Sequence, residues 1–320
     1  LRSIHIWYSI IIYMKPKFLM VSKYGWAATS PLIYTLQRKS KYAHFGYTKG
    51  LRYFNKSLTY KDSFTTPELS IRVLNNTWEN WNSHKQGAHN MNTTEDLEPL
   101  RDFPLSHFRS LISGRTKIHK YITFYTALHE HVVKKGYKSV GSGWCYRLTP
   151  FIRKFYKELQ KEFEIKHIKI VRDPVRRAFG QFLGKCPEIN DFPEHFYIPS
   201  YIDKIKEDNE VWGEENNHIV IMEELWEGDG TAKRELSEFL DHPVTDLWKN
   251  LYAPDRGHLV RYDKDIPCQA YGQDRFEMTT ELYYKAKEKL QFVYDEWEDY
   301  YGSLPLYWGV PLDYETGKPL

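Results

Sequence analysis

One stretch of the chain, HIKIVRDPVRRAFGQFLG from His167 to Gly184, joins two kinds of local structure within a few residues. It begins as an apolar run rich in β-branched residues, which favours a buried strand, and it ends as a basic segment with helical character. Arg-Asp-Pro lies at the junction, where Asp173 can cap a helix and Pro174 suits the first helical position. The stretch therefore predicts a strand that passes directly into a helix.

The same alternation of strand and helix recurs along the chain. Short apolar runs predict strands at 17–21, at 137–141 and within 216–226, and helical patterns fill 31–40, 119–136 and 150–163. Gly136 can end the second of these helices. A last amphipathic helix, with Gly302 just past it, is predicted by apolar residues spaced three and four apart: Leu282, Ala286, Leu290, Val293 and Trp297. Such alternation predicts an α/β fold, in which helices flank a parallel sheet in three α/β/α layers, similar to P-loop proteins.

The chain of 320 residues is expected to form a single domain over 1–320. Residues 56–108 are rich in Asn, Thr, His and Trp with little periodicity, which is typical of an insertion or lid. The apolar stretch from Ile4 to Met14 is well short of the roughly 20 residues that span a bilayer. Residues 1–13 are therefore interpreted as an N-terminal extension or an added strand, in a cytoplasmic protein. A clipped membrane anchor, which would place the protein in the lumen of the secretory pathway, is the alternative.

Charge and cysteine content narrow the expected partners. A formal net charge of +3 is too small to indicate a nucleic-acid binder by itself, although a local basic site remains compatible with it. Cys145, Cys186 and Cys268 are far apart and form no CxxC pair. We expect reduced thiols and no structural metal.

Two loops that follow predicted strands have the character of anion sites. Ligands of parallel sheets bind outside the carboxyl ends of the strands, and Arg172 stands at such an end, beside a helix N-terminus. Its planar guanidinium suits a phosphate, although a strand-end arginine paired with a surface carboxylate would look the same in sequence. The second loop, VSKYGWAATS from Val21 to Ser30, also opens a helix and contains Lys23 and Gly25. Two such loops in one sheet suit a ligand with phosphates at both ends.

These two motifs resemble those of the sulfotransferase superfamily, which uses 3′-phosphoadenosine 5′-phosphosulfate (PAPS). That family has Lys-x-Gly-Thr-Thr after its first strand, where this chain has Lys23-Tyr24-Gly25, and Arg-Asp-Pro-x-x-Arg-Ala-x-Ser later, where this chain has RDPVRRAFG. The resemblance implies that PAPS is the co-substrate, with Arg172 and the position of Gly180 at the 3′-phosphate. Arg256 stands where some members of the family have a late basic loop against that phosphate, and an ordinary turn is the alternative interpretation of this stretch. The resemblance also implies that the 5′-phosphosulfate is held by the first loop: Lys23, Tyr24, Gly25, Trp26, Ala27, Ala28, Thr29 and Ser30.

The chain also departs from the family pattern. Trp26 and Ala27 replace the Thr-Thr pair, Gly180 replaces the serine, and Gly50 occupies the place of the glutamate that serves as base in many carbohydrate-acting members. His44 is the histidine nearest to that vacated position, so it is the predicted base, and packing in the core is its alternative role. Further histidines that could serve are His107, His119, His129 and His131.

The sequence thus predicts a sulfotransferase that transfers a sulfuryl group from PAPS to a hydroxyl acceptor. Lys23 is expected to stabilise the departing oxygen. The acceptor is expected to be a small molecule or a carbohydrate, which Trp78 or Trp81 could stack, and no nucleic acid, stable membrane span or metal is expected. A catalytically degenerate relative that binds a nucleotide or glycan is the alternative. A P-loop kinase is disfavoured because no Gly-Lys-Ser/Thr follows the glycine.

Overall fold

A computed structural model describes residues 15–23, 32–33, 35–44, 103, 115–143, 150–185, 198–245 and 279–311. Within these ranges, five strands form one sheet in the order β2-β3-β1-β4-β5. Every neighbouring pair is parallel. The strands are β1 (Lys17–Lys23), β2 (Ala43–His44), β3 (Ser139–Gly143), β4 (Glu164–Val171) and β5 (Asn217–Ile221). The predicted parallel α/β sheet is therefore confirmed.

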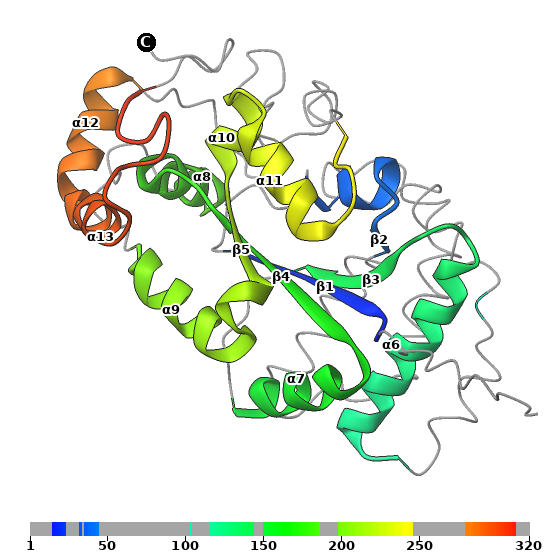
Figure 1. Ribbon diagram of the computed structural model, residues 1–320. Coiled ribbons are helices and arrows are strands. Elements are labelled where there is room, and N and C mark those ends of the chain that lie inside the picture. The colour runs from blue at the N-terminus through cyan, green and yellow to red at the C-terminus, as the bar shows by residue number, and fades with distance from the viewer. Residues whose placement is uncertain are drawn as a thin grey trace, which may run out of the picture.

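Helices cover both faces of this sheet. Figure 1 shows α6, α7 and α9 on one side of the strands and α10 and α11 on the other, so the fold has three layers. The long helices are α6 (Lys117–Val133), α7 (Pro150–Glu162), α8 (Pro174–Lys185), α9 (Tyr201–Trp212), α11 (Thr231–Leu240), α12 (Thr280–Lys289) and α13 (Gln291–Tyr301). Shorter helical segments are η1 (Thr35–Lys39), η4 (Glu214–Asn216) and α10 (Met222–Glu227).

The central strands are apolar because both of their faces are buried. Four consecutive residues of β1, from Phe18 to Val21, are 0% exposed. On the side of α6, the ring of Phe18 packs edge-on against Tyr125 with ring centroids 4.8 Å apart. Burial on both faces removes the polar alternation of a half-exposed strand, which is why these segments appear in the sequence as short continuous apolar runs.

The C-terminal helix predicted from the apolar spacing is in fact two helices. The helical path breaks at Leu290, whose φ of −104° and ψ of 10° separate α12 from α13. The apolar face nevertheless continues across the break, since Ala286, Leu290, Val293 and Trp297 are all less than 5% exposed. Gly302 ends α13 in a left-handed conformation, as the sequence predicted.

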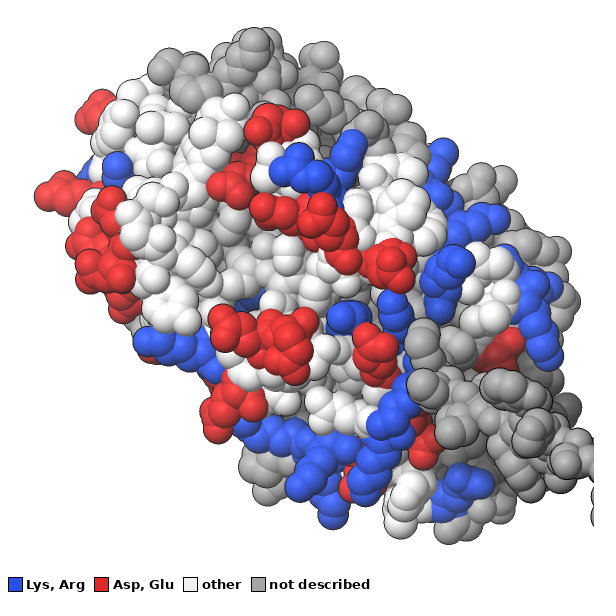
Figure 2. Space-filling view, viewed as in Figure 1, with Lys and Arg blue, Asp and Glu red and all other residues white. Residues whose placement is uncertain are grey.

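Charges on the face seen in Figure 2 are mixed in sign. Lys and Arg side chains gather over α7, whereas Asp and Glu side chains gather over α10 and α11 and over the C-terminal helices. This distribution agrees with the small net charge of the chain. Among the described residues, no helix is long and apolar enough to span a membrane.

Several sequence-based expectations lie outside the described residues. They include the extension at 1–13, the loop from Tyr24 to Ser30 and the late-loop Arg256. The proposed insertion at 56–108, with Trp78 and Trp81, also lies outside them except for Phe103, as does Gly50.

Candidate functional site

The carboxyl edge of the sheet brings Lys23 and Arg172, one residue from each predicted anion-binding motif, close together. Strands β1 and β4 are direct neighbours, and Lys23, the last residue of β1, is paired in register with Ile170. Arg172 follows two residues later, directly beyond β4. With strands about 4.8 Å apart and a rise of about 3.3 Å per residue, the Cα atoms of Lys23 and Arg172 are separated by roughly 8 Å. The backbones of Lys23 and Arg172 therefore lie at the same region of the edge.

The turn between β4 and α8 has the geometry that the sequence predicted. Pro174 is the first residue of α8. Oδ1 of Asp173 accepts a hydrogen bond from the backbone N–H of Arg176 at 2.9 Å, which is the bond of a helix N-cap. Asp173 is 0% exposed, so this cap is fully buried. The capped N-terminus of α8 and Arg172 thus share one turn, which is a favourable place for an anion.

The Arg172 side chain is held near a carboxylate that the sequence did not identify as part of the site. Its Nε lies 3.8 Å from Oε1 of Glu223, and the Arg172 side chain retains 14% exposure. Glu223 follows β5 and is itself only 5% exposed. Its Oε1 also accepts the backbone N–H of Asp173 at 3.1 Å. The arginine is therefore paired with a buried carboxylate, and not with a surface carboxylate as the alternative interpretation assumed.

The two other arginines of the motif contribute to the packing around the turn. Arg176 is 4% exposed, lies 3.3 Å from Glu223 Oε1, and donates to the backbone carbonyl of Val310 at 2.7 Å. Arg177 is 6% exposed, and its guanidinium lies 5.4 Å from the centre of the Tyr201 ring. Of the three arginines, Arg172 is the most accessible to a ligand.

Gly180, the residue at the family's serine position, lies inside α8. It stands six residues after Pro174, which corresponds to about 9 Å along the helix axis at a rise of about 1.5 Å per residue. The position is therefore near the middle of this 12-residue helix, beyond its first turn. A glycine there presents no hydroxyl to an anion.

His44 does not lie at the level of Lys23. It is paired with Val140 of β3, and Val140 is paired with Phe18 of β1. Phe18 precedes Lys23 by five residues, or about 16 Å of strand. His44 is also 0% exposed, with its ring edge-on to Tyr137 at 5.0 Å. The register and burial agree with a packed core histidine and argue against the predicted catalytic base.

The other histidines that the sequence suggested as candidate bases differ in their surroundings. His119 is exposed and its Nδ1 lies 2.8 Å from the Thr116 hydroxyl. Burial lowers the pKa of His129, and the ring of His131 packs against Phe103 at 5.4 Å. His107 lies outside the described residues. Within the described ranges, no group of three His, Cys, Asp or Glu residues could hold a metal ion.

Comparisons with known proteins give matches among solved structures alone. No family model matches the chain, and no curated protein matches it. A sulfotransferase from Alicyclobacillus acidocaldarius is 15% identical, with 91% of this chain and 97% of that chain covered and a TM-score of 0.41. A sulfotransferase from Mycobacterium avium is 14% identical, with 91% and 78% covered and a TM-score of 0.39.

A retinol dehydratase solved with androsterone and the inactive cofactor PAP is 13% identical, with 89% of this chain and 82% of that chain covered and a TM-score of 0.37. Sulfotransferases are thus among the solved structures to which this chain is similar, and the motifs around Lys23 and Arg172 resemble those of the sulfotransferase superfamily.

Proposed function

We propose that the protein binds PAPS and transfers its sulfuryl group to an acceptor hydroxyl. The observation that carries this proposal is the placement of Lys23 at the end of β1 and of Arg172 directly beyond β4, two neighbouring parallel strands of the sheet. Arg172 would bind the 3′-phosphate, and Lys23 with the loop that follows it would bind the 5′-phosphosulfate.

The charges of the Arg-Asp-Pro turn support an anion at Arg172. Arg172 and Arg176 both lie within 4 Å of the Glu223 carboxylate, and the motif contains a third arginine, Arg177, against one further carboxylate in the turn, Asp173. Together these five groups carry one net positive charge. Glu223 is closer to Arg176, at 3.3 Å, than to Arg172, at 3.8 Å. Arg172 is therefore the more weakly paired of the two arginines near Glu223, and its guanidinium can donate two parallel hydrogen bonds to a phosphate.

Sulfuryl transfer requires position and countercharge from the protein. The acceptor oxygen attacks sulfur, the bond from sulfur to the bridging oxygen breaks, and 3′-phosphoadenosine 5′-phosphate (PAP) leaves with the electron pair. Negative charge grows on the bridging oxygen, and the ammonium of Lys23 would stabilise it. The acceptor proton passes to a base, which the burial of His44 suggests is a different residue. A carbohydrate hydroxyl is the proposed class of acceptor.

A second function, binding without turnover, is favoured by two substitutions. Gly50 stands where carbohydrate-acting members of the superfamily have a glutamate base, and Gly180 stands at the serine position. A degenerate relative would bind PAP with Arg172 and yet transfer nothing. Incubation with PAPS labelled in its sulfuryl group and a panel of hydroxyl acceptors separates the two functions, because labelled product appears with an active enzyme alone.

Calorimetric titration with PAP and with adenosine 5′-phosphate tests the phosphate assignment. Wild type should bind PAP more tightly, and Arg172→Ala should lose about 1.5–3 kcal/mol of that preference. Arg234→Ala, which removes a positive charge whose hydrogen-bond partner is Thr231 of its own helix, is the control and should keep the preference. Equal affinity of wild type for the two nucleotides would rule out a 3′-phosphate site.

A further inference from the structure

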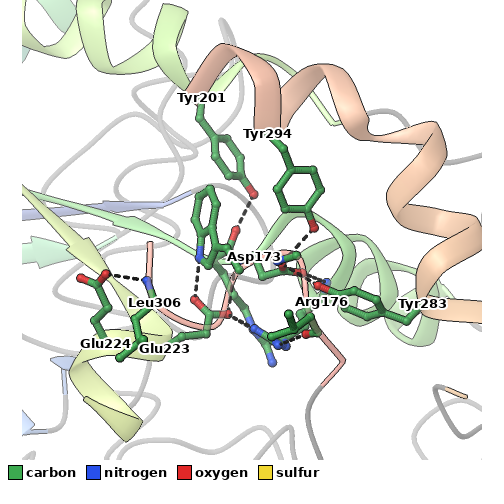
Figure 3. A network of polar contacts seen from close by, with 12 residues as sticks. Asp173, Arg176, Tyr201, Glu223, Glu224, Tyr283, Tyr294 and Leu306 are labelled. Carbon is green, nitrogen blue, oxygen red and sulfur yellow. Dashed lines mark hydrogen bonds and ion pairs between the residues drawn. The ribbon is translucent and has the colours of Figure 1, made fainter. Parts of the chain in front are cut away.

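The carboxylate of Asp173 accepts far more hydrogen bonds than a helix cap requires. Its Oδ1 makes the capping bond to Arg176 N. Its Oδ2 accepts three more, from Tyr283 Oη at 2.9 Å, Tyr294 Oη at 2.9 Å and Gly309 N at 3.0 Å. Figure 3 shows the tyrosines converging on this carboxylate. One bond explains the cap, so the three donors at Oδ2 need another explanation.

All three additional donors come from the C-terminal segment 279–311, more than 100 residues away along the chain. Tyr283 belongs to α12, Tyr294 to α13, and Gly309 follows both helices. The same segment also contacts Glu223, the partner of Arg172, since Trp308 Nε1 donates to Glu223 Oε2 at 3.1 Å. The C-terminal segment thus contacts both the Asp173 carboxylate in the turn and the Glu223 carboxylate beside it.

Arg172 itself is held by a third tyrosine. Tyr201 of α9 donates its hydroxyl to the backbone carbonyl of Arg172 at 2.9 Å. Backbone and side chain of the arginine are therefore each restrained, the backbone by Tyr201 and the side chain by Glu223. Asp173, the residue after Arg172, connects this arrangement to the C-terminal helices through the hydroxyls of Tyr283 and Tyr294.

These hydroxyls remain donors over the physiological pH range. Burial raises the pKa of Tyr283 and of Tyr294 well above the usual value, and the neighbouring Asp173 carboxylate raises both further. Burial likewise raises the pKa of Tyr201 to about 12. A carboxylate that is fully buried is unfavourable unless donors surround it, so each lost donor should loosen the turn.

We propose that Tyr283 and Tyr294 are positioning residues, which hold Asp173 and thereby fix the adjacent Arg172 in the orientation that receives a 3′-phosphate. This inference rests on the proposed function, because it takes Arg172 as the phosphate ligand. It makes the C-terminal helices a part of the nucleotide site through Asp173, which both tyrosine hydroxyls contact.

The test uses Tyr283→Phe and Tyr294→Phe, which each remove one hydroxyl and keep the ring. Titration with PAP and adenosine 5′-phosphate gives the preference for the 3′-phosphate, and thermal unfolding reports stability. In each variant the ratio of the affinity for PAP to that for adenosine 5′-phosphate should fall about tenfold, as expected for a lost hydrogen bond to a charged group. The affinity for adenosine 5′-phosphate itself should change little. Tyr284→Phe is the matched control, because Tyr284 is adjacent on α12 and 49% exposed.

A purely structural role would give a different result. Both variants would then melt at lower temperature while the preference for PAP stayed at the wild-type ratio, and the proposal would be overturned. In an Arg172→Ala background, Tyr294→Phe should change the preference no further, and an additional loss there would also contradict a role through Arg172. If wild type shows no preference for PAP, it is the proposed function that fails, so the two failures are distinct.

Hydrogen exchange of wild type gives a test that needs no substitution. PAP should slow amide exchange in α12 and α13 more than adenosine 5′-phosphate does, because occupancy of Arg172 and the hydroxyl contacts to Asp173 support each other. Equal protection by the two nucleotides would contradict the proposal even if a variant failed to fold.

Discussion

The Ser22 hydroxyl and Nε2 of His167 lie 2.7 Å apart inside the sheet, directly before Lys23. Nδ1 of the same ring lies 2.6 Å from Oδ1 of Asn217, whose amide donates to Asn209. Because Asn217 uses its amide on Asn209, its oxygen accepts from Nδ1, and Nε2 is left to accept from Ser22. A neutral His167 thus ties the end of β1 to β4, β5 and α9.

Stability should fall in mildly acid solution because of this histidine. Burial lowers the pKa of His167 from 6.5 to about 4, outweighing the Asp208 carboxylate, which acts to raise it. Below about pH 6.5, His167 is protonated in the unfolded chain, whereas in the folded protein it becomes protonated only near pH 4. The free energy of unfolding should therefore decrease across that window by roughly 1.4 kcal/mol per pH unit, and not above it.

Urea unfolding between about pH 7 and pH 5 measures this slope. His167→Gln should give a shallower decline, although His218, whose pKa burial also lowers to about 4, still contributes. His119→Gln, a change at an exposed histidine, should leave the slope unchanged. A His167→Gln slope equal to that of wild type would contradict the assignment.

The buried ion pair between Lys169 and Asp208 should be costly to break from either side. Nζ and Oδ2 lie 2.5 Å apart, with the side chains 7% and 8% exposed. Lys169→Met or Asp208→Leu should each destabilise the protein by about 3–5 kcal/mol, because each leaves one charge buried without its partner. The double variant should recover most of that loss in denaturant unfolding. If the two losses simply add, the pair does not act as a unit.

Lys23→Ala should lower kcat more than it weakens PAP binding. The proposed charge matters most when the bridging oxygen becomes negative, so a loss of ~10²–10³ in rate is expected. Lys23→Arg should restore little, because a broad guanidinium does not replace a compact ammonium. Steady-state transfer to an identified acceptor, with nucleotide titration alongside, gives both quantities. Near wild-type turnover in Lys23→Ala would leave the loop a binding role only.

The same steady-state transfer assay tests whether the buried His44 acts as the catalytic base. We expect His44→Ala to lower stability by about 2 kcal/mol through the cavity it leaves, and to keep the transfer rate of the folded fraction. The control is His119→Ala, at an exposed position, which should change neither quantity. A large fall in kcat with unchanged melting temperature would restore His44 as the base.

The sequence by itself determined the local elements and where the residues of the candidate site stand relative to them. Strand β1 and the junction of β4 with α8 could be predicted because the apolar runs, the Asp173 cap and Pro174 act on residues a few positions apart. The position of Arg172 between the end of β4 and the start of α8 could be predicted for the same reason. The break at Leu290 could not, since the apolar spacing of one long helix and of two helices sharing a face is the same.

The tertiary structure alone decided which strands are neighbours and which distant residues complete the turn. An apolar run that is buried on both faces contains no signal for its partner or register, so the pairing of β1 with β4 was not predictable, nor was the depth of His44 below Lys23. Glu223, Tyr283 and Tyr294 reach Asp173 from positions at least 50 residues away. The tyrosines meet the need of the buried Asp173 carboxylate for hydrogen-bond donors, and Glu223 accepts from its backbone N–H. Any donor or acceptor folded against the turn could have met these needs, so the local sequence does not identify them.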